Sequence, residues 1–319
     1  MKEKGIKVSF VDFDIWGKGF NPYGSVLMKI LKTKFNIVKE DSNPDFVFCS
    51  CFHHKVLEYD CPRIFWTGEP VFPDFNIYDY ALGFNDLGFQ DRYLRFPIWL
   101  GYEKSWKLAM KKHLIPDEEL LGRKKFCNFV YSNAGDNSKR KDLFDAISEY
   151  KRVDSGGGYL NNIGGRCADK FEVQRDYKFS CAFENSSYDG YVTEKIFDAF
   201  AAGTIPIYFG TDYISKEVNP KAFINCNDFH STEELLDCIR KIDCDDSAYL
   251  KIMHEPVFTE GSEAYKNFVS DDFTKIIDFF TNIFEDNFGI IRRNQTWAGK
   301  IYEKPLKEGP LKKLRKHFL

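Results

Sequence analysis

The sequence predicts an α/β protein with two Rossmann-like domains, each built on a parallel sheet. Three observations lead to this prediction: strand-like apolar runs alternate with helix-like segments, the alternation occurs twice along the chain, and a polar stretch separates the two occurrences. The 319 residues are 43% hydrophobic and 17% aromatic, which is enough to fill two hydrophobic cores. Ligands of such sheets bind beyond the carboxyl ends of the strands, so polar residues that follow strands are the first candidates for function.

The first half of the chain combines strand-like runs with one clear helix-like run. The predicted strands are residues 6–14, 45–52 and 61–69. The apolar spacing of residues 24–35 predicts an amphipathic helix. Short aromatic-rich elements follow, and the polar segment 104–125 is the expected boundary. We therefore expect a first domain over residues 1–120.

The second half of the chain repeats the alternation from residue 124. The predicted strands are residues 124–133, 178–185 and 205–210, and the predicted helices are residues 140–150, 170–177, 191–202, 232–242, 246–253 and 261–284. This pattern predicts a second domain over residues 121–290 and a tail over residues 291–319. The helix at 261–284 is a candidate to cross back to the first domain.

The charge of the chain is distributed unevenly. The formal net charge of −3 argues against general nucleic-acid binding. Residues 300–319 hold seven Lys or Arg and two Glu, a local charge of +5 that leaves −8 for the rest of the chain. Leu311, Leu314 and Phe318 recur at spacings of three and four among these cations, which suits a short helix on anionic lipid. The alternative is a frayed tail in water.

Nine cysteines without paired spacing indicate reduced thiols. The sequence has no signal-peptide pattern and no apolar run of about 18 residues, so we expect a cytoplasmic protein. Cys49, Cys51 and His53 would share one face of a strand, which is loosely typical of a metal site. Because no second pair of ligands accompanies them, we expect no metal.

The stretch FENSSYDGYVTEKIFDAFAAGTIPIYFG (183–210) places Glu194 and Lys195 near the start of a predicted helix that follows a strand. Free backbone N–H groups, the positive end of the helix dipole and the lysine charge would attract a phosphate there. The Glu194 carboxylate could accept hydrogen bonds from paired sugar hydroxyls, and a phosphate beside a sugar indicates a nucleotide. The alternative is a first-turn glutamate that stabilises the helix beside a lysine in water.

Two further segments fit a nucleotide. Arg140 opens the next helix after a strand and could clamp a diphosphate. In DSGGGYLNNIGG (154–165), Gly157 lies in a glycine run that permits close backbone approach, while Asn161 and Asn162 could read a base edge. The spacing fits neither a G-x-G-x-x-G motif nor a P-loop. The alternative for Arg140 is a surface arginine, and the alternative for residues 154–165 is a mobile turn.

A carboxylate also follows a strand in the first half. FWTGEPVFPDF (65–75) places Glu69 between Gly68 and Pro70, where the predicted strand 61–69 ends. A carboxylate in this position could act as the general base for an incoming hydroxyl. The alternative is a turn carboxylate in water.

Together these stretches resemble the bacterial alpha-1,3/4-fucosyltransferases, an inverting family of the GT-B type. Residues 183–210 are similar to the signature block of that family, with Phe209 at a position where the family has tryptophan. The other similar segments are IFWTGEPVFPDFNIYDYALGFNDL (64–87), RYLRFPIWL (92–100) and SGGGYLNNIGG (155–165). The resemblance extends over residues 6–285. It implies two facing Rossmann-like domains, with the acceptor bound by the N-terminal one and GDP-L-fucose by the C-terminal one.

The resemblance also implies roles for residues. The implied donor-binding residues are Arg140 and Lys195 for the diphosphate, Glu194 for the ribose, and Asn185 and Tyr191 for the pocket lining. Glu69 would be the general base of a single displacement that yields an alpha-fucoside. Fixed cations would stabilise the departing diphosphate, so no metal or other cofactor would be required.

The resemblance further implies the partners of the enzyme. The acceptor would be the 3-hydroxyl of GlcNAc in an N-acetyllactosamine-type oligosaccharide or lipopolysaccharide, giving a Lewis X-like product. The protein would be cytoplasmic, with residues 300–319 in peripheral contact with the inner face of the membrane. Two alternatives stay open: a GT-B transferase that uses another nucleotide sugar, and a non-catalytic protein that binds a nucleotide sugar.

Overall fold

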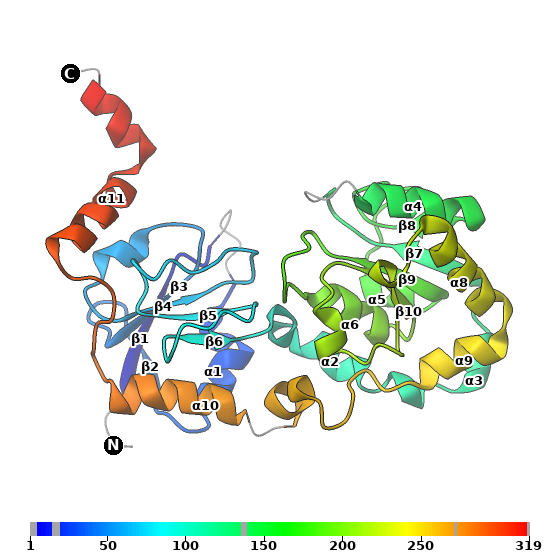
Figure 1. Cartoon of the computed structure of the whole chain (residues 1–319), viewed down its shortest axis with the longest axis horizontal. Helices are drawn as coiled ribbons and strands as arrows, with labels where there is room; N and C mark the ends of the chain where they lie inside the picture. Colours follow the sequence, from blue (N-terminus) through cyan, green and yellow to red (C-terminus); the bar gives the residue numbers. More distant parts are fainter. Residues whose placement is uncertain (1–4, 15–19, 135–138, 271–272, 318–319) are drawn as a thin grey trace. The chain divides into compact units, whose positions relative to one another are not determined.

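The computed structural model describes residues 5–14, 20–134, 139–270 and 273–317, and the chain divides into two compact units. Unit 1 comprises Met1–Phe96 and Phe273–Leu319, and unit 2 comprises Pro97–Asp272. Each unit contains one sheet, and every strand pair in both sheets is parallel (Figure 1). The predicted α/β class with two parallel sheets is therefore confirmed.

Unit 1 is built on a six-stranded sheet of order β2-β1-β3-β4-β5-β6. Its strands are β1 (Ile6–Val11), β2 (Ile37–Lys39), β3 (Phe46–Cys49), β4 (Arg63–Trp66), β5 (Tyr80–Gly83) and β6 (Tyr93–Arg95). The helices of this unit are α1 (Val26–Leu31), α10 (Thr274–Thr281) and α11 (Trp297–His317). Ser25 caps α1 by accepting a hydrogen bond from the backbone N–H of Met28. The apolar faces of α1 and α10 pack together beside the sheet (Figure 1).

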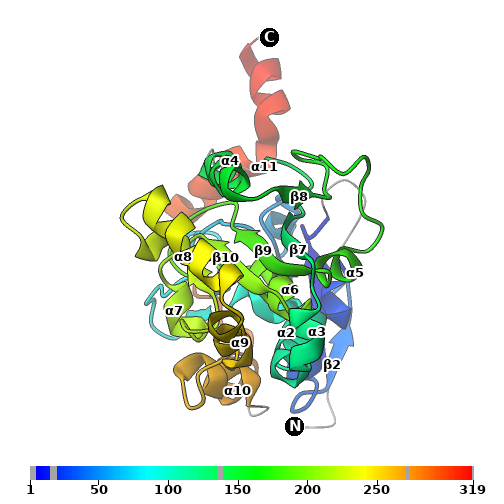
Figure 2. The ribbon, with the colours of Figure 1, turned by 90° about the vertical axis from the view of Figure 1, so that its right-hand side faces the viewer.

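Unit 2 is built on a five-stranded sheet of order β11-β10-β9-β7-β8. Its strands are β7 (Lys125–Phe129), β8 (Val153–Ser155), β9 (Tyr177–Phe183), β10 (Ile205–Phe209) and β11 (Ile224–Asn225). Its helices are α2 (Glu103–Ala109), α3 (Asp117–Leu121), α4 (Lys139–Tyr150), α5 (Lys170–Gln174), α6 (Glu194–Ala201), α7 (Ile214–Glu217), α8 (Thr232–Cys244) and α9 (Asp246–His254). Helix α6 packs on β9 and β10 and also on α2, and α4 packs on α8 (Figure 2).

The division of the chain differs from the predicted one. Unit 2 begins at Pro97 rather than near residue 121, because Trp99 is fully buried in its core. The indole ring lies 4.8 Å from the Phe197 ring, and its N–H donates a hydrogen bond of 2.7 Å to Glu217 Oε2. Unit 2 ends at Asp272 rather than residue 290.

The predicted helix 261–284 consists of two helical pieces in different units. A π-helical turn covers Tyr265–Val269 in unit 2, and α10 begins at Thr274 in unit 1. Phe273 precedes α10 with a left-handed φ of 42°, which interrupts the helical path. The apolar spacing continues across this break, which is why the sequence alone predicts one helix.

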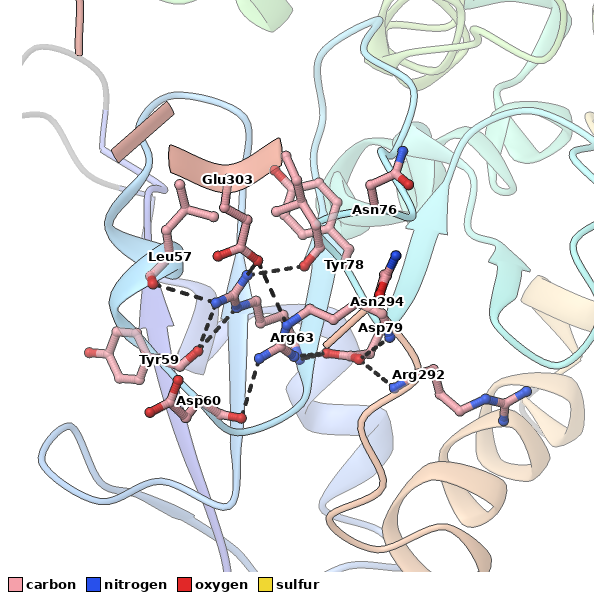
Figure 3. Close-up of polar contacts among 12 residues, drawn as sticks. Leu57, Tyr59, Asp60, Arg63, Asn76, Tyr78, Asp79, Arg292, Asn294 and Glu303 are labelled. Carbon is pink, nitrogen blue, oxygen red and sulfur yellow. Dashed lines mark hydrogen bonds and ion pairs between the residues drawn. The ribbon is translucent and has the colours of Figure 1, made fainter. Parts of the chain in front are cut away.

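Buried charges tie the C-terminal segment to the sheet of unit 1 (Figure 3). The Asp79 carboxylate accepts hydrogen bonds from the backbone N–H groups of Arg292 and Arg293, at 2.6 and 2.8 Å, and pairs with the Arg293 guanidinium. Arg63 of β4 lies 2.6 Å from Glu303 of α11. The start of α11 therefore belongs to the folded body of unit 1. None of the described helices is both long and apolar enough to cross a membrane.

Candidate functional site

A cavity of about 580 Å³ lies beyond the carboxyl ends of β7 and β9 in unit 2. Its walls come from the segments that follow these strands, from the glycine-rich loop after β8 and from the first two turns of α6. The charged residues that line it are Arg166, Lys170, Glu194, Lys195 and Asp198. This volume is within the range of small-ligand sites. Four predicted site residues line the cavity: Gly157, Asn185, Glu194 and Lys195.

Glu194 and Lys195 are the first two residues of α6, which begins three residues later than predicted. The Lys195 ammonium lies 3.5 Å from Glu194 Oε1 and donates a hydrogen bond of 2.8 Å to Thr193 Oγ1. Burial alone would lower the pKa of Lys195, but the charges of Glu184 and Glu194 outweigh it and raise the pKa. Lys195 therefore carries a fixed positive charge at the cavity wall.

Glu194 is more exposed to solvent than Lys195, with a quarter of its side chain exposed. Burial would raise its pKa, but the charges of Lys195 and Lys170 outweigh that effect and lower the pKa. Its carboxylate therefore stays ionised and can accept hydrogen bonds from a ligand in the cavity.

Glu184 is a member of this cluster that the sequence analysis missed. Its side chain is fully buried, and one carboxylate oxygen lies 3.1 Å from Lys195 Nζ. The carboxylate also accepts hydrogen bonds from Thr193, at 2.8 Å from the backbone N–H and 2.7 Å from the hydroxyl. Burial raises the pKa of Glu184, and the charge of Lys195 offsets only part of this shift. A glutamate directly after an apolar strand was the available signal, and it points to no role by itself.

Arg140 lies behind the cavity rather than in its lining. The side chain is fully buried in the first turn of α4. Its guanidinium donates hydrogen bonds to the carbonyl oxygens of Ala134, at 3.2 Å, and Phe183, at 2.8 Å, and a third to Asn185 Oδ1. It also stacks 4.6 Å from the centre of the Tyr131 ring. In this arrangement Arg140 positions Asn185, and its contact with a diphosphate stays a prediction.

Tyr191 is also buried, with 3% of its surface exposed, and it is not among the cavity-lining residues. Its backbone N–H donates a hydrogen bond of 2.9 Å to the carbonyl of Tyr188 in the loop that leads to α6. The structure therefore buries Tyr191 outside the lining of this cavity, which differs from the predicted place in the lining.

The glycine-rich loop approaches the backbone of Tyr131 closely at Gly157. A Cβ atom at Gly157 would overlap the backbone N and O atoms of Tyr131, so only glycine fits. The side-chain amide of Asn161 donates to the carbonyls of Gly157 and Gly165, at 2.8 and 2.9 Å.

Asn162 likewise bonds to the backbone of its own segment. Its side chain donates to the carbonyl of Val153 at 2.8 Å and accepts from the N–H of Ser155 at 2.7 Å. Neither Asn161 nor Asn162 lines the cavity, so both asparagines fix the shape of the loop in this structure rather than present a free amide to a base.

Three further charged residues of the cavity escaped the sequence analysis. The Asp198 carboxylate accepts hydrogen bonds from Ser105 Oγ, at 2.6 Å, and from Lys170 Nζ, at 2.8 Å. Arg166 is exposed, and its guanidinium lies directly over Gly158. Arg166 lies in a loop, Lys170 begins α5 and Asp198 lies in the second turn of α6, so only the fold brings the three to one cavity.

Glu69 is exposed in unit 1, three residues beyond the end of β4. Its backbone N–H donates to Thr67 Oγ1 at 3.2 Å, and its carbonyl accepts from the N–H of Val71 at 2.7 Å. These bonds hold the turn and leave the carboxylate in water. Glu69 is therefore exposed to solvent beyond the carboxyl end of β4.

Cys49, Cys51 and His53, which are loosely typical of a metal site, each contact another polar group of the protein. The Cys49 thiol lies 3.6 Å from the carbonyl of Ile64, Cys51 Sγ lies 3.2 Å from Thr67 Oγ1, and His53 Nε2 lies 3.1 Å from the carbonyl of Asp14. In the part of the chain that the structure describes, no group of three or more His, Cys, Asp or Glu could hold a metal ion.

Two models of known protein families together match most of the chain. Residues 8–102 match the alpha-(1,3)-fucosyltransferase FucT N-terminal domain, and residues 120–254 match the C-terminal region of glycosyltransferase family 10, the fucosyltransferases. The chain is 34% identical to the alpha-(1,3)-fucosyltransferase FucT of Helicobacter pylori over 82% of its own length. It spans 62% of the length of that relative. It is also 35% identical over 133 residues to alpha-(1,3)-fucosyltransferase C of Drosophila melanogaster, covering 40% of this chain and 31% of that protein.

Solved structures show the same relationship over nearly the whole chain. A crystal structure of alpha1,3-fucosyltransferase with GDP-fucose matches with a TM-score of 0.77 and 30% identity, covering 92% of this chain and 95% of the other. The same enzyme class crystallised with GDP matches with a TM-score of 0.75 and the same identity, covering 92% of this chain and 93% of the other.

Proposed function

The chain belongs to glycosyltransferase family 10, the fucosyltransferases, and we propose that it transfers L-fucose from GDP-L-fucose to an oligosaccharide. The family membership and the solved relatives confirm the resemblance and the GT-B fold class that the sequence predicts. The observation that carries the proposed activity is the cavity of unit 2, where a buried ammonium and an ionised carboxylate stand side by side at the start of α6.

The cavity suits a nucleoside diphosphate sugar. Lys195 supplies a fixed positive charge for the diphosphate, and the free N–H groups of the first turn of α6 add to the attraction. Glu194 offers acceptor oxygens to the ribose hydroxyls. Asn185, held by Arg140, supplies a polar group of fixed orientation. The exposed Arg166 is a further cation for the phosphates or the base.

We propose an inverting single displacement with Glu69 as the general base. The acceptor hydroxyl loses its proton to the Glu69 carboxylate while its oxygen forms a bond to the anomeric carbon of fucose. The bond between that carbon and the phosphate oxygen breaks, and its electron pair leaves with GDP. Negative charge grows on the departing diphosphate, so Lys195 binds the transition state more strongly than the ground state. This chemistry requires no metal ion.

A panel of donors tests the proposed substrate. GDP-fucose, GDP-mannose and a UDP-sugar are supplied with N-acetyllactosamine, the proposed acceptor whose GlcNAc 3-hydroxyl would be fucosylated, and with lacto-N-biose as the comparison. We expect transfer from GDP-fucose to N-acetyllactosamine, with a Lewis X-like product. Transfer only from GDP-mannose or a UDP-sugar would show that the cavity holds another nucleotide sugar. Binding of GDP-fucose without transfer to any acceptor would indicate a non-catalytic binding protein.

The C-terminal segment supports a second proposal, peripheral binding to an anionic membrane from the cytoplasm. Trp297 and Ile301 lie one turn apart on α11 and are 76% and 59% exposed, with the exposed Lys300 and Lys304 close by in the sequence. Exposed aromatic and aliphatic side chains among lysines suit the interface of an anionic bilayer. Leu311 and Leu314 fall within α11, but their side chains and all of Phe318 lie outside the described residues.

Sedimentation with vesicles tests the membrane proposal. The informative deletion removes residues 308–319, which hold four of the seven cations after residue 299 but spare Glu303 and its bond to Arg63. We expect the full chain to sediment with vesicles that contain phosphatidylserine and not with neutral vesicles, and the deletion to lose most of this binding. Equal sedimentation of the two proteins would refute the proposal.

A further inference from the structure

We infer that Glu184 is a positioning residue for donor binding, which holds the Lys195 ammonium at the cavity wall from behind. This inference rests on the proposed function, because it concerns the same cavity and its diphosphate ligand. Glu184 does not line the cavity, whereas Lys195 and Glu194 do. The carboxylate therefore acts through the lysine rather than on the ligand.

The contacts of Glu184 fix two parts of the site at once. Its carboxylate accepts both hydrogen bonds that Thr193 can donate, from the N–H at 2.8 Å and the hydroxyl at 2.7 Å. Thr193 directly precedes α6, so these bonds fasten the start of that helix to the end of β9. The third contact, 3.1 Å to Lys195 Nζ, fixes the ammonium relative to the same helix end. The Glu184 side chain thus holds both groups that would donate hydrogen bonds to a phosphate, the start of α6 and the Lys195 ammonium.

A buried ammonium needs such a partner. The Lys195 side chain is 11% exposed, so its charge is largely removed from water. Glu184 is fully buried and cannot leave the ammonium for solvent, whereas Glu194 is a quarter exposed and lies farther away, at 3.5 Å. Without Glu184, the ammonium would pair with Glu194 alone. That pairing would engage the carboxylate proposed for the ribose and turn the lysine away from the phosphates.

The neighbours of Glu184 hold the second cation. The carbonyl of Phe183 and the side chain of Asn185 both accept hydrogen bonds from the Arg140 guanidinium. Three consecutive residues at the end of β9 therefore fix both cations that the resemblance assigns to the diphosphate. This arrangement positions positive charge before the ligand arrives, which lowers the cost of organising the site on binding.

The Glu184→Gln variant tests the inference, because it keeps the shape of the side chain and removes its charge. GDP and guanosine affinities are measured by calorimetry on the full chain. We expect the variant to bind GDP about tenfold more weakly, the weight of one charge-assisted hydrogen bond, and guanosine within about twofold of wild type. A merely structural role would weaken both ligands alike, so the ratio of the two affinities is the decisive readout.

Asp243→Asn is the matched control. Asp243 is a buried carboxylate of unit 2 that pairs with Lys151, at 3.0 Å, and Lys178, at 3.5 Å, and it does not line the cavity. This variant also loses a buried charge, and we expect its GDP and guanosine affinities to stay within about twofold of wild type. Equal losses of GDP affinity in Asp243→Asn and Glu184→Gln would overturn the inference.

If Glu184→Gln fails to fold, Thr193→Val provides a second test of the inference. It keeps the backbone N–H and removes only the hydroxyl that bridges Glu184 and Lys195. We expect a selective loss of GDP affinity, smaller than that of Glu184→Gln. Unchanged or tighter GDP binding by the variant that folds would overturn the inference and leave the proposed function standing. Failure of the wild-type chain to bind GDP would overturn both.

Discussion

Arg63 and Glu303 are separated by 240 residues in the sequence, yet Arg63 Nη1 lies 2.6 Å from Glu303 Oε1 in a largely buried ion pair (Figure 3). The two side chains are 2% and 11% exposed. The remaining guanidinium donors of Arg63 are bonded to the carbonyls of Leu57, Tyr59 and Ile77. The pair shows that unit 1 is complete only when the C-terminal segment has joined it.

Replacement of Glu303 by alanine is expected to destabilise unit 1 by about 3 kcal/mol, because it leaves the buried Arg63 charge without its carboxylate. Lys304→Ala is the control, since Lys304 is exposed on the same helix and its loss is expected to cost less than about 0.5 kcal/mol. Urea unfolding measures both free energies. Equal stability of the two variants would contradict the anchoring role of Glu303.

Gly157→Ala is expected to destabilise unit 2 by about 3 kcal/mol or more and to abolish GDP binding. The added Cβ would overlap the backbone of Tyr131, which cannot move aside as a flexible side chain could. Gly165→Ala in the same loop is the control, because its Cβ would meet no atom within 4 Å. Thermal unfolding and calorimetry with GDP compare the two variants. GDP binding by Gly157→Ala at wild-type strength would show that the close approach is not needed.

Lys112 gives the stability of unit 2 a predicted pH dependence. Its ammonium is buried and donates hydrogen bonds to the carbonyls of Ile252 and Met253, at 2.9 and 2.8 Å, at the end of α9. Burial lowers the pKa of Lys112 to about 7, and the charge of Glu255 offsets only a small part. In the unfolded chain the pKa returns to about 10.4, so between these values the folded state binds fewer protons. Unfolding free energy should therefore rise with pH above about 7, by at most about 1.4 kcal/mol per pH unit.

Lys112→Met isolates this effect. The variant loses two hydrogen bonds at every pH. As the pH rises from about 7 to 8.5, the unfolding free energy of wild type should increase relative to that of the variant. The buried thiols contribute equally to both proteins, so taking the difference between wild type and variant cancels their effect on the unfolding free energy. Burial raises the pKa values of these thiols, which would make the unfolding free energy fall with pH above about 8.5. A difference that stays constant over this window would show that Lys112 remains charged in the folded protein.

The fold was predictable where the periodic pattern is long. β9, α6 and β10 lie within three residues of their predicted bounds, because a buried strand and an amphipathic helix give strong, distinct spacings. β2 and β8 were missed, since three residues carry too little pattern to identify a strand. The break before α10 was missed because it depends on one backbone angle at Phe273 and on packing against α1.

The site was predictable only in part. Motif position placed Glu194, Lys195 and Asn185 at the cavity, since residues that follow parallel strands meet at one edge. Burial of Arg140 and Glu184 depends on which side chains meet across β7, β9 and α6, and the sequence contains no periodic signal for such pairings. Glu184 was therefore missed, although it lies next to a residue that was predicted.

The most direct measurement of the central claim is the initial rate of fucose transfer from GDP-fucose to N-acetyllactosamine in EDTA, by wild type and by Glu69→Gln, with the GDP affinity of each. We predict turnover by wild type in the chelator, and a loss of about 100-fold or more in Glu69→Gln, because the glutamine cannot accept the proton. GDP affinity should stay equal in both, since Glu69 is not among the residues that line the donor cavity. Turnover by Glu69→Gln within a few-fold of wild type would contradict the assignment of the base, and absence of wild-type transfer at saturating donor and acceptor, with or without added Mg²⁺ or Mn²⁺, would contradict the proposed activity.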